Sequence, residues 1–216
     1  MATNTGELTL AQNSPLSMFD ISGKSALVMG ATGSFGGAAA TALAQMGCDM
    51  TIADLNPEKL EAKTEELRAT GAKVATAVGL PDSEATAASI VDAAVAAYGA
   101  LDLMFVATGM TTGYTGYCAS KAGLDGMVRA LACEWGGKNA NINAIGPTVF
   151  RSPLSEWMFS DEDPGKATRE AMLERVPVGR LSETDDLMGG LIYLLSPASD
   201  YVTGHTLYID GGYTAE

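Results

Sequence analysis

Short apolar runs alternate with longer stretches of helical character along most of this chain, and this alternation constrains its fold more than any other feature. Strands that alternate with helices favour a parallel sheet with helices on both faces. We therefore predict a doubly wound α/β fold. The predicted strands are residues 25–29, 49–53, 74–78, 101–106, 141–145 and 206–209, and the predicted helices are residues 36–46, 57–69, 82–98, 114–135 and 185–195.

Composition limits what the protein can bind. The net charge of −13 argues against nucleic acid or an anionic membrane as a partner, because phosphates would be repelled. No run reaches the ~18 apolar residues that a membrane span needs. Residues 1–18 lack the apolar core of a signal peptide, so we expect them to be a flexible leader and the protein to be cytoplasmic. We expect residues 19–216 to form a single domain.

Cysteine and histidine are too sparse to suggest metal or triad chemistry. Cys48, Cys118 and Cys133 form no CxxC pair, and their odd number does not indicate a disulfide framework. His205 is the only histidine, so a metal site or a Ser/His/Asp triad would have few residues to draw on. We expect no metal, and we predict a structural role for His205.

A glycine-rich turn joins the first predicted strand to the first predicted helix, and it reads Gly30, Ala31, Thr32, Gly33, Ser34, Phe35, Gly36 and Gly37. Glycines let the backbone approach a pyrophosphate, and the free N–H groups of a helix N-terminus bind anions. Asp54 ends the next strand 24 residues after Gly30, where a carboxylate can bind both ribose hydroxyls of an adenosine. The alternative for Asp54 is a residue that only caps the following turn.

The residues around Asp54 favour NAD over NADP. The carboxylate would repel a phosphate on the ribose. Its neighbours Gly33, Leu55 and Asn56 provide no Arg or Lys to bind one. We therefore expect NAD as the coenzyme.

Tyr117 and Lys121 form a YxxxK pattern only eight residues after Gly109. In a helix this spacing places the phenol and the ammonium on one face, one turn apart. A nearby cation favours the phenolate form of a tyrosine, which suits the side chain to general acid or base catalysis. By itself the pattern is short, and an exposed Tyr and Lys on a helix surface is the alternative reading.

Together these features resemble the short-chain dehydrogenase/reductase family over residues 19–213. Other matching segments are Leu101–Asp102, Asn143 to Pro147, Tyr201 to Gly204, and Asp210 to Gly212. The resemblance implies a Rossmann-like fold, NAD, an alcohol or ketone substrate, and a homodimer or homotetramer. Within the family, the segments resemble NAD-linked polyol or sugar-acid dehydrogenases and oxoacyl-carrier reductases.

The resemblance also implies roles for particular residues. Tyr117 would be the general acid or base, and Lys121 would support it and bind the nicotinamide ribose. The implied coenzyme-binding residues are Gly30, Ser34, Phe35, Gly36, Asp54, Leu55, Leu80, Ala107, Gly109, Tyr117, Lys121, Pro147, Phe150 and Ser152. Five positions depart from the family pattern: Ser34 replaces a glycine, Val106 and Ala107 replace two asparagines, Gly79 replaces an aspartate, and Thr148 replaces a glycine.

The largest departure lies between Gly109 and Tyr114. The family normally places a helix, a central strand and an active-site serine there, which needs about 30 residues or more. Either a segment has been omitted from the chain or the deletion is genuine. Omission is favoured because the loss of a central strand would uncover apolar surface and remove ladder hydrogen bonds. We expect a break or disorder between Gly109 and Tyr114, with Thr108, Thr111, Thr112 and Ser120 as the nearby hydroxyls.

The stretch at about residues 152–179 carries Trp157, Met158 and Phe159 followed by acidic residues. It is similar to the lid that covers the substrate in this family, and a surface excursion that packs on the sheet is the alternative. The predicted function is NAD(H)-dependent hydride transfer between nicotinamide and a secondary alcohol or ketone. The alternatives are an oxoacyl-carrier reductase and a dinucleotide-binding protein without turnover.

Overall fold

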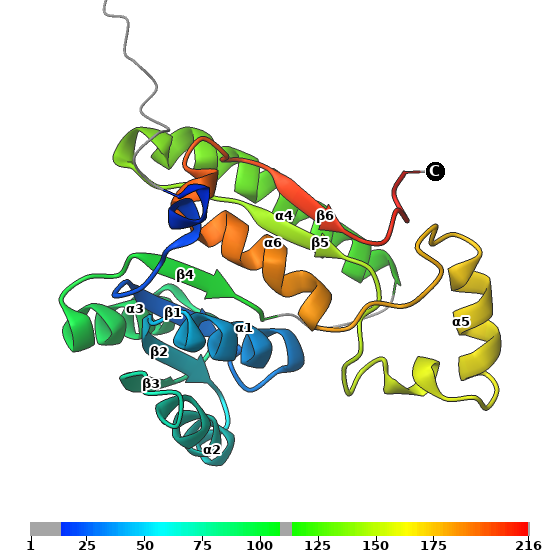
Figure 1. Cartoon of the computed structure of the whole chain (residues 1–216), viewed down its shortest axis with the longest axis horizontal. Helices are drawn as coiled ribbons and strands as arrows, with labels where there is room; N and C mark the ends of the chain where they lie inside the picture. The colour runs from blue at the N-terminus through cyan, green and yellow to red at the C-terminus, as the bar shows by residue number, and fades with distance from the viewer. Residues whose placement is uncertain (1–13, 109–113, 216) are drawn as a thin grey trace, which may run out of the picture.

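The computed structural model describes residues 14–108 and 114–215, and within these residues the strands form two parallel sheets (Figure 1). The first sheet has the order β3-β2-β1-β4 and the second pairs β5 with β6. The strands are β1 (Ser25–Met29), β2 (Asp49–Asp54), β3 (Val74–Val78), β4 (Leu103–Val106), β5 (Ala144–Pro147) and β6 (Thr206–Ile209). This confirms the predicted α/β fold with parallel strands.

Helices cover both faces of the first sheet. Alternate residues of β1 point to opposite sides, so that Ala26 and Val28 join one core cluster while Leu27 and Met29 join another. The first cluster includes buried residues of α1 (Ser34–Gln45) and α2 (Pro57–Arg68), and the second includes buried residues of α3 (Glu84–Tyr98). β1 is therefore buried on both faces, as expected for a central parallel strand.

The start of α2 shows how the sequence determines where a helix begins. The Asn56 side chain accepts a hydrogen bond from the Lys59 N–H, and Pro57 occupies the first helical position. This is the favoured arrangement for a helix N-terminus, and the structure places it where the sequence predicts.

The second sheet is less buried by helices than the first. α6 (Asp185–Leu195) packs on β5 and β6 and also contacts α1, while α4 (Tyr114–Trp135) lies behind the sheet in the view of Figure 1. β5 begins at Ala144, three residues later than predicted. The reason is that Asn143 is engaged elsewhere: its side chain donates to the Val202 carbonyl and accepts from the His205 N–H.

The single continuous sheet that we predicted is divided between β4 and β5. Only seven residues separate Val106 from Tyr114, too few for a helix and a strand, and residues 109–113 lie outside the described part of the chain. Within the described residues, one edge of β4 and one edge of β5 consequently have no strand partner. The predicted break between Gly109 and Tyr114 also falls outside the described residues.

Several short elements complete the described chain: η1 (Pro15–Phe19), η2 (Gly136–Lys138), η3 (Glu156–Phe159), α5 (Gly165–Leu173) and η4 (Pro197–Ser199). Residues 1–13, most of the predicted leader, lie outside the described residues. Among the residues that are described, no helix is both long enough and apolar enough to cross a membrane.

Candidate active site

The glycine-rich turn lies at the carboxyl end of β1 and is packed tightly against the end of β4. Gly30 has a φ of +79°, and a Cβ placed there would lie 3.1 Å from the Ala107 carbonyl carbon. A Cβ on Gly36 would collide with the Gly30 carbonyl. The two positions therefore require glycine, and they bring the first turn of α1 close to the sheet edge.

Asp54 joins the end of β2 to this turn. One carboxylate oxygen accepts a hydrogen bond from the Thr32 N–H at 3.0 Å, and the other accepts one from the Leu55 N–H at 2.7 Å. Burial raises the pKa of the Asp54 carboxyl, but these hydrogen bonds outweigh it, and the pKa lies below its ordinary value. Asp54 thus carries a negative charge at neutral pH beside the turn, and it also caps the chain at Leu55.

An aromatic cluster links the two sheets at the same edge. The Phe35 ring at the start of α1 lies 5.0 Å from the Phe105 ring of β4 and 5.8 Å from the Phe150 ring, which follows β5, centroid to centroid. Both contacts are edge-to-face, the favoured geometry for aromatic pairs. The structure therefore brings together Phe35 and Phe150, two residues predicted to bind coenzyme.

The remaining predicted coenzyme positions follow strand ends or begin α1. Ala107 donates its N–H to the Met29 carbonyl at 2.9 Å, and the Ser152 hydroxyl pairs with the Ser155 hydroxyl at 2.9 Å. Ser34 is the first residue of α1, Leu80 follows β3, and Pro147 ends β5. Gly109 lies outside the described residues.

Tyr117 and Lys121 lie one turn apart in the first half of α4. The Lys121 ammonium is 5.5 Å from the centroid of the Tyr117 ring, so the expected pairing on one helix face is present. Every residue from 115 to 124 is exposed. The candidate acid or base and its cation are therefore adjacent, on helix turns that the described chain leaves unpacked.

The second half of α4 packs against the residues that precede and begin β6. Val128 and Ala132 are buried, and a Cβ on Gly204 would lie 3.2 Å from the Ala132 Cβ. The Thr206 hydroxyl donates to the Asp125 carboxylate at 2.7 Å. Sequence reasoning missed Asp125, because its contact with Thr206 joins positions 81 residues apart. It also missed Thr32, the partner of Asp54.

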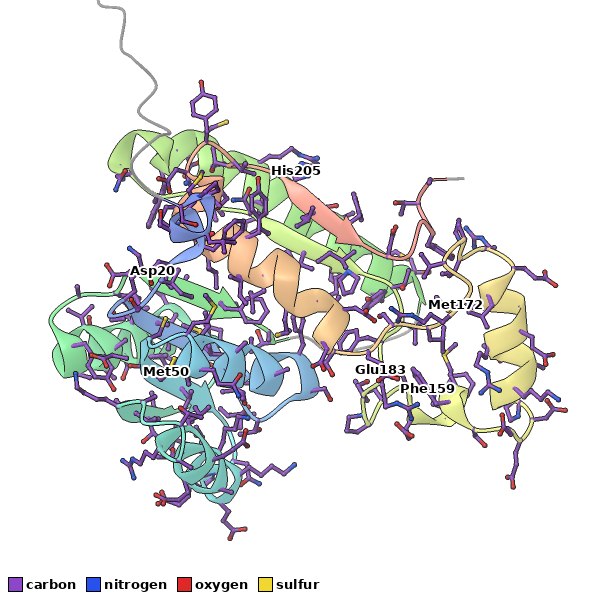
Figure 2. All side chains as sticks on the ribbon, viewed as in Figure 1. Asp20, Met50, Phe159, Met172, Glu183 and His205 are labelled. Carbon is purple, nitrogen blue, oxygen red and sulfur yellow. The ribbon has the colours of Figure 1, made fainter. Side chains whose placement is uncertain are left out.

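A small bridge between Phe150 and Ser182 lies just outside the two ends of the predicted lid. Next to this bridge the Arg151 guanidinium stacks on the Phe159 ring at 4.0 Å and pairs with Glu156 and Glu183. Figure 2 shows Phe159 and Glu183 at this end of the molecule and His205 away from them at the start of β6. His205 is exposed, and the structural role expected for it stays a prediction.

The residues at this edge fit a nicotinamide dinucleotide. The glycines of the turn place no side chain over its backbone, and the Gly33 cap leaves the first N–H groups of α1 without a side-chain partner. Asp54 adds an acceptor for ribose hydroxyls. In the described part of the chain, no group of three or more His, Cys, Asp or Glu side chains is arranged to hold a metal ion.

Comparisons with known proteins show which family the chain belongs to. The profile described as short chain dehydrogenase matches residues 24–115, and the profile described as Enoyl-(Acyl carrier protein) reductase matches residues 106–214. An uncharacterized oxidoreductase of Mycobacterium tuberculosis is 38% identical to this chain, covering 97% of it and 99% of the relative. The chain belongs to the short-chain dehydrogenase/reductase family and is an oxidoreductase of that family.

Solved structures share the fold. A short-chain type dehydrogenase/reductase from Mycobacterium marinum is 21% identical and superposes with a TM-score of 0.81 over 94% of this chain and 100% of its own. A gluconate 5-dehydrogenase from Burkholderia cenocepacia, in complex with NADP and tartrate, is 23% identical with a TM-score of 0.83 over 94% and 100%. These likenesses show the fold; a nicotinamide dinucleotide is typical of the short-chain dehydrogenase/reductase family to which the chain belongs.

The alignment with the Mycobacterium tuberculosis relative also bears on the divided sheet. It runs over 269 positions, 53 more than the 216 residues of this chain. At least 53 positions of the relative therefore have no counterpart here. That length is ample for the helix and strand that we expected before Tyr114.

Proposed function

We propose that this protein is an NAD(H)-dependent oxidoreductase acting on a secondary alcohol or the corresponding ketone, with Tyr117 as general acid and base. The observation that carries the proposal is the Tyr117–Lys121 pair on α4, the helix that follows β4 at the carboxyl edge of the first sheet. Such edges are where doubly wound α/β proteins bind dinucleotides.

The chain's own residues would hold the coenzyme at several points. The turn at Gly30 and Gly36 would receive the pyrophosphate on the first N–H groups of α1, and Asp54 would accept from the adenosine ribose hydroxyls. Phe150 would offer backbone atoms to the carboxamide. When bound, the nicotinamide supplies or accepts a hydride.

Tyr117 would exchange a proton at the substrate oxygen. In the oxidation direction its phenolic oxygen accepts the hydroxyl proton, and in reduction the phenol returns it. Lys121 would favour the phenolate by its positive charge. A polyol or sugar acid is the favoured substrate class, and the predicted lid at about residues 152–179 would close over it with Trp157 and Phe159 as an apolar wall.

NAD is proposed over NADP because of the carboxylate at Asp54. A ribose phosphate would approach this negative charge, and Leu55 and Asn56 bring no cation to offset it. Titration of NADH and NADPH into wild type and Asp54→Ala tests this step. We expect wild type to prefer NADH by at least about tenfold and the variant to lose the preference; equal affinity in wild type would contradict it.

Kinetics test the mechanism. NADH oxidation with a panel of ketones and NAD reduction with polyols should show turnover in wild type, and Tyr117→Phe should lower kcat by at least about a hundredfold. NADH affinity should change little in Tyr117→Phe, which separates catalysis from binding. Unchanged turnover in this variant would rule out the assigned role.

Dinucleotide binding without turnover is a second candidate function. The observation that favours it is the exposure of all residues from 115 to 124, which leaves the catalytic turns of α4 without packing. NADH binding with no turnover on any ketone or polyol would support this candidate.

A further inference from the structure

β4 is an unusual edge strand. It consists of Leu103, Met104, Phe105 and Val106, without the charged residue or proline that commonly protects an exposed sheet edge. Met104 is 51% exposed and Val106 is 46% exposed, whereas every residue of the neighbouring strand β1 is buried. β4 therefore has the composition of an interior strand in an edge position.

α4 carries apolar side chains that the described chain does not cover. Leu124 is 40% exposed and Met127 is 50% exposed, and both lie near the middle of the helix. Exposed apolar residues on neighbouring elements mark surfaces that another polypeptide covers. Here they belong to the two elements that flank the division of the sheet.

Both sheets keep the positions that they have in a solved structure of this fold. A single superposition on the Mycobacterium marinum structure covers 94% of this chain with a TM-score of 0.81, so β1–β4 and β5–β6 are placed by the same transformation. The two sheets also point their strands in the same direction (Figure 1). We call the space bounded by the free edges of β4 and β5 the β4–β5 gap.

We propose that the β4–β5 gap is a strand-acceptor site that binds a separate polypeptide segment consisting of a helix followed by one apolar strand parallel to β4 and β5. The length comparison argues for this occupant, because at least 53 positions of the Mycobacterium tuberculosis relative have no counterpart in this chain. The two family profiles meet at residues 106–115, which places the discontinuity beside the gap.

The geometry determines the kind of segment that fits. A strand that pairs with both free edges satisfies their backbone groups, and it must run parallel to both. A parallel strand enters a sheet through a crossover, usually a helix, and that helix would cover the exposed apolar residues of α4 and β4. A strand alone would leave Met104, Leu124 and Met127 exposed.

A peptide with the sequence of the relative's unmatched segment tests the proposal by calorimetric titration into the full chain. We expect one peptide per chain, micromolar affinity and slower hydrogen exchange at β4. A second peptide carries N-methyl groups along its strand, which removes the ladder donors while keeping the side chains. We expect it to bind at least tenfold more weakly; equal affinity would overturn strand insertion.

Two matched variants locate the binding edge. Val106→Glu places a charge at the gap, on a side chain already exposed, so folding is retained and peptide affinity should fall at least tenfold. Val78→Glu makes the same change at a 65% exposed site on β3, the opposite edge of the same sheet, and should alter affinity less than twofold. Equal effects of the two variants would overturn the assignment to the gap.

Other occupants give different results. If a second copy fills the gap, sedimentation shows a dimer that Val106→Glu dissociates, and the peptide does not bind. If residues 1–13 fill it, their removal raises peptide affinity. Either result overturns the proposal. Peptide binding does not depend on turnover, so a chain that binds the peptide yet never oxidises NADH would count against the proposed function alone.

Discussion

The two sheets of this protein consist of similar apolar strands but differ in how well they are packed. In the first sheet β1 is fully buried between β2 and β4, and helices cover both faces. In the second sheet the residues of β5 and β6 are only partly buried or exposed, and the N-terminal half of α4 is exposed. The difference shows that a parallel strand becomes core only when it has a neighbour on each side and a helix on each face.

The same contrast separates the two parts of the proposed active site. The proposed coenzyme residues Gly30, Gly36 and Asp54 are held by backbone contacts within the well-packed sheet. The catalytic candidates Tyr117 and Lys121 lie on exposed turns whose helix is anchored only farther along. We therefore expect coenzyme binding to be the more robust of the two activities.

The largest effect on coenzyme binding is expected at the glycine turn. Gly36→Ala forces a Cβ against the Gly30 carbonyl, so it should cost at least ~2 kcal/mol of unfolding free energy and weaken NADH binding at least tenfold. Gly126→Ala on α4 is the matched control, because a Cβ there meets nothing within 4 Å. Denaturant unfolding and NADH titration check both, and equal losses would contradict the account.

Truncating a side chain should lower the unfolding free energy more in the first sheet than in the second. Ile52 of β2 is fully buried, so Ile52→Ala should lower the unfolding free energy by about 3–4 kcal/mol. Ile145 of β5 is only partly buried, and Ile145→Ala should cost about 1–2 kcal/mol because part of its surface already contacts water. Urea unfolding measures both; a larger loss for Ile145→Ala would reverse the comparison.

The anchor of α4 should have a smaller, local effect. Asp125→Ala removes the acceptor of the Thr206 hydroxyl, which should cost about 1 kcal/mol and speed hydrogen exchange in α4. Glu134→Ala, farther along the same helix with an exposed side chain, is the control. If the two variants exchange alike, Asp125 does not anchor the helix.

The smallest effect should come from the Arg180–Asp186 pair. Two hydrogen bonds from the Arg180 guanidinium to Asp186 hold the pKa of that carboxyl at about 2. Its folded-state pKa is lowered, so the stabilisation is present above pH ~4 and is lost as the pH falls toward 2. Asp186→Asn should cost roughly 0.5–1 kcal/mol at pH 7. The difference in unfolding free energy between Asp186→Asn and wild type should shrink as the pH falls. A difference that stayed constant with pH would contradict the assigned cause.

Local signals predicted most of the fold. Alternating apolar runs located β1, β3 and β6 to the residue, and Asn56 with Pro57 located the start of α2. The divided sheet was not predicted as such, because hydrophobic pattern identifies strands but not which strands pair. β5 began late because Asn143 bonds to residues about 60 positions away, a contact that no local pattern reveals.

The roles of the site residues stay predictions, and the structure reports only where these residues lie. Short motifs identified Asp54, Tyr117 and Lys121, since each follows a strand or lies at helical spacing. The Thr32 and Asp125 contacts depend on how loops and helices meet in space, so their sequence positions alone gave no clear signal. The aromatic contact between Phe35 and Phe150 also joins two sheets that only the folded chain brings together.

Hydrogen exchange of the whole chain, with and without NADH, tests the central comparison most directly. We predict strong protection in β1 and β2, fast exchange over residues 115–124, and added protection around Gly30 and Asp54 when NADH is present. Uniform protection across both sheets, or no response to NADH around Gly30 and Asp54, would contradict the account.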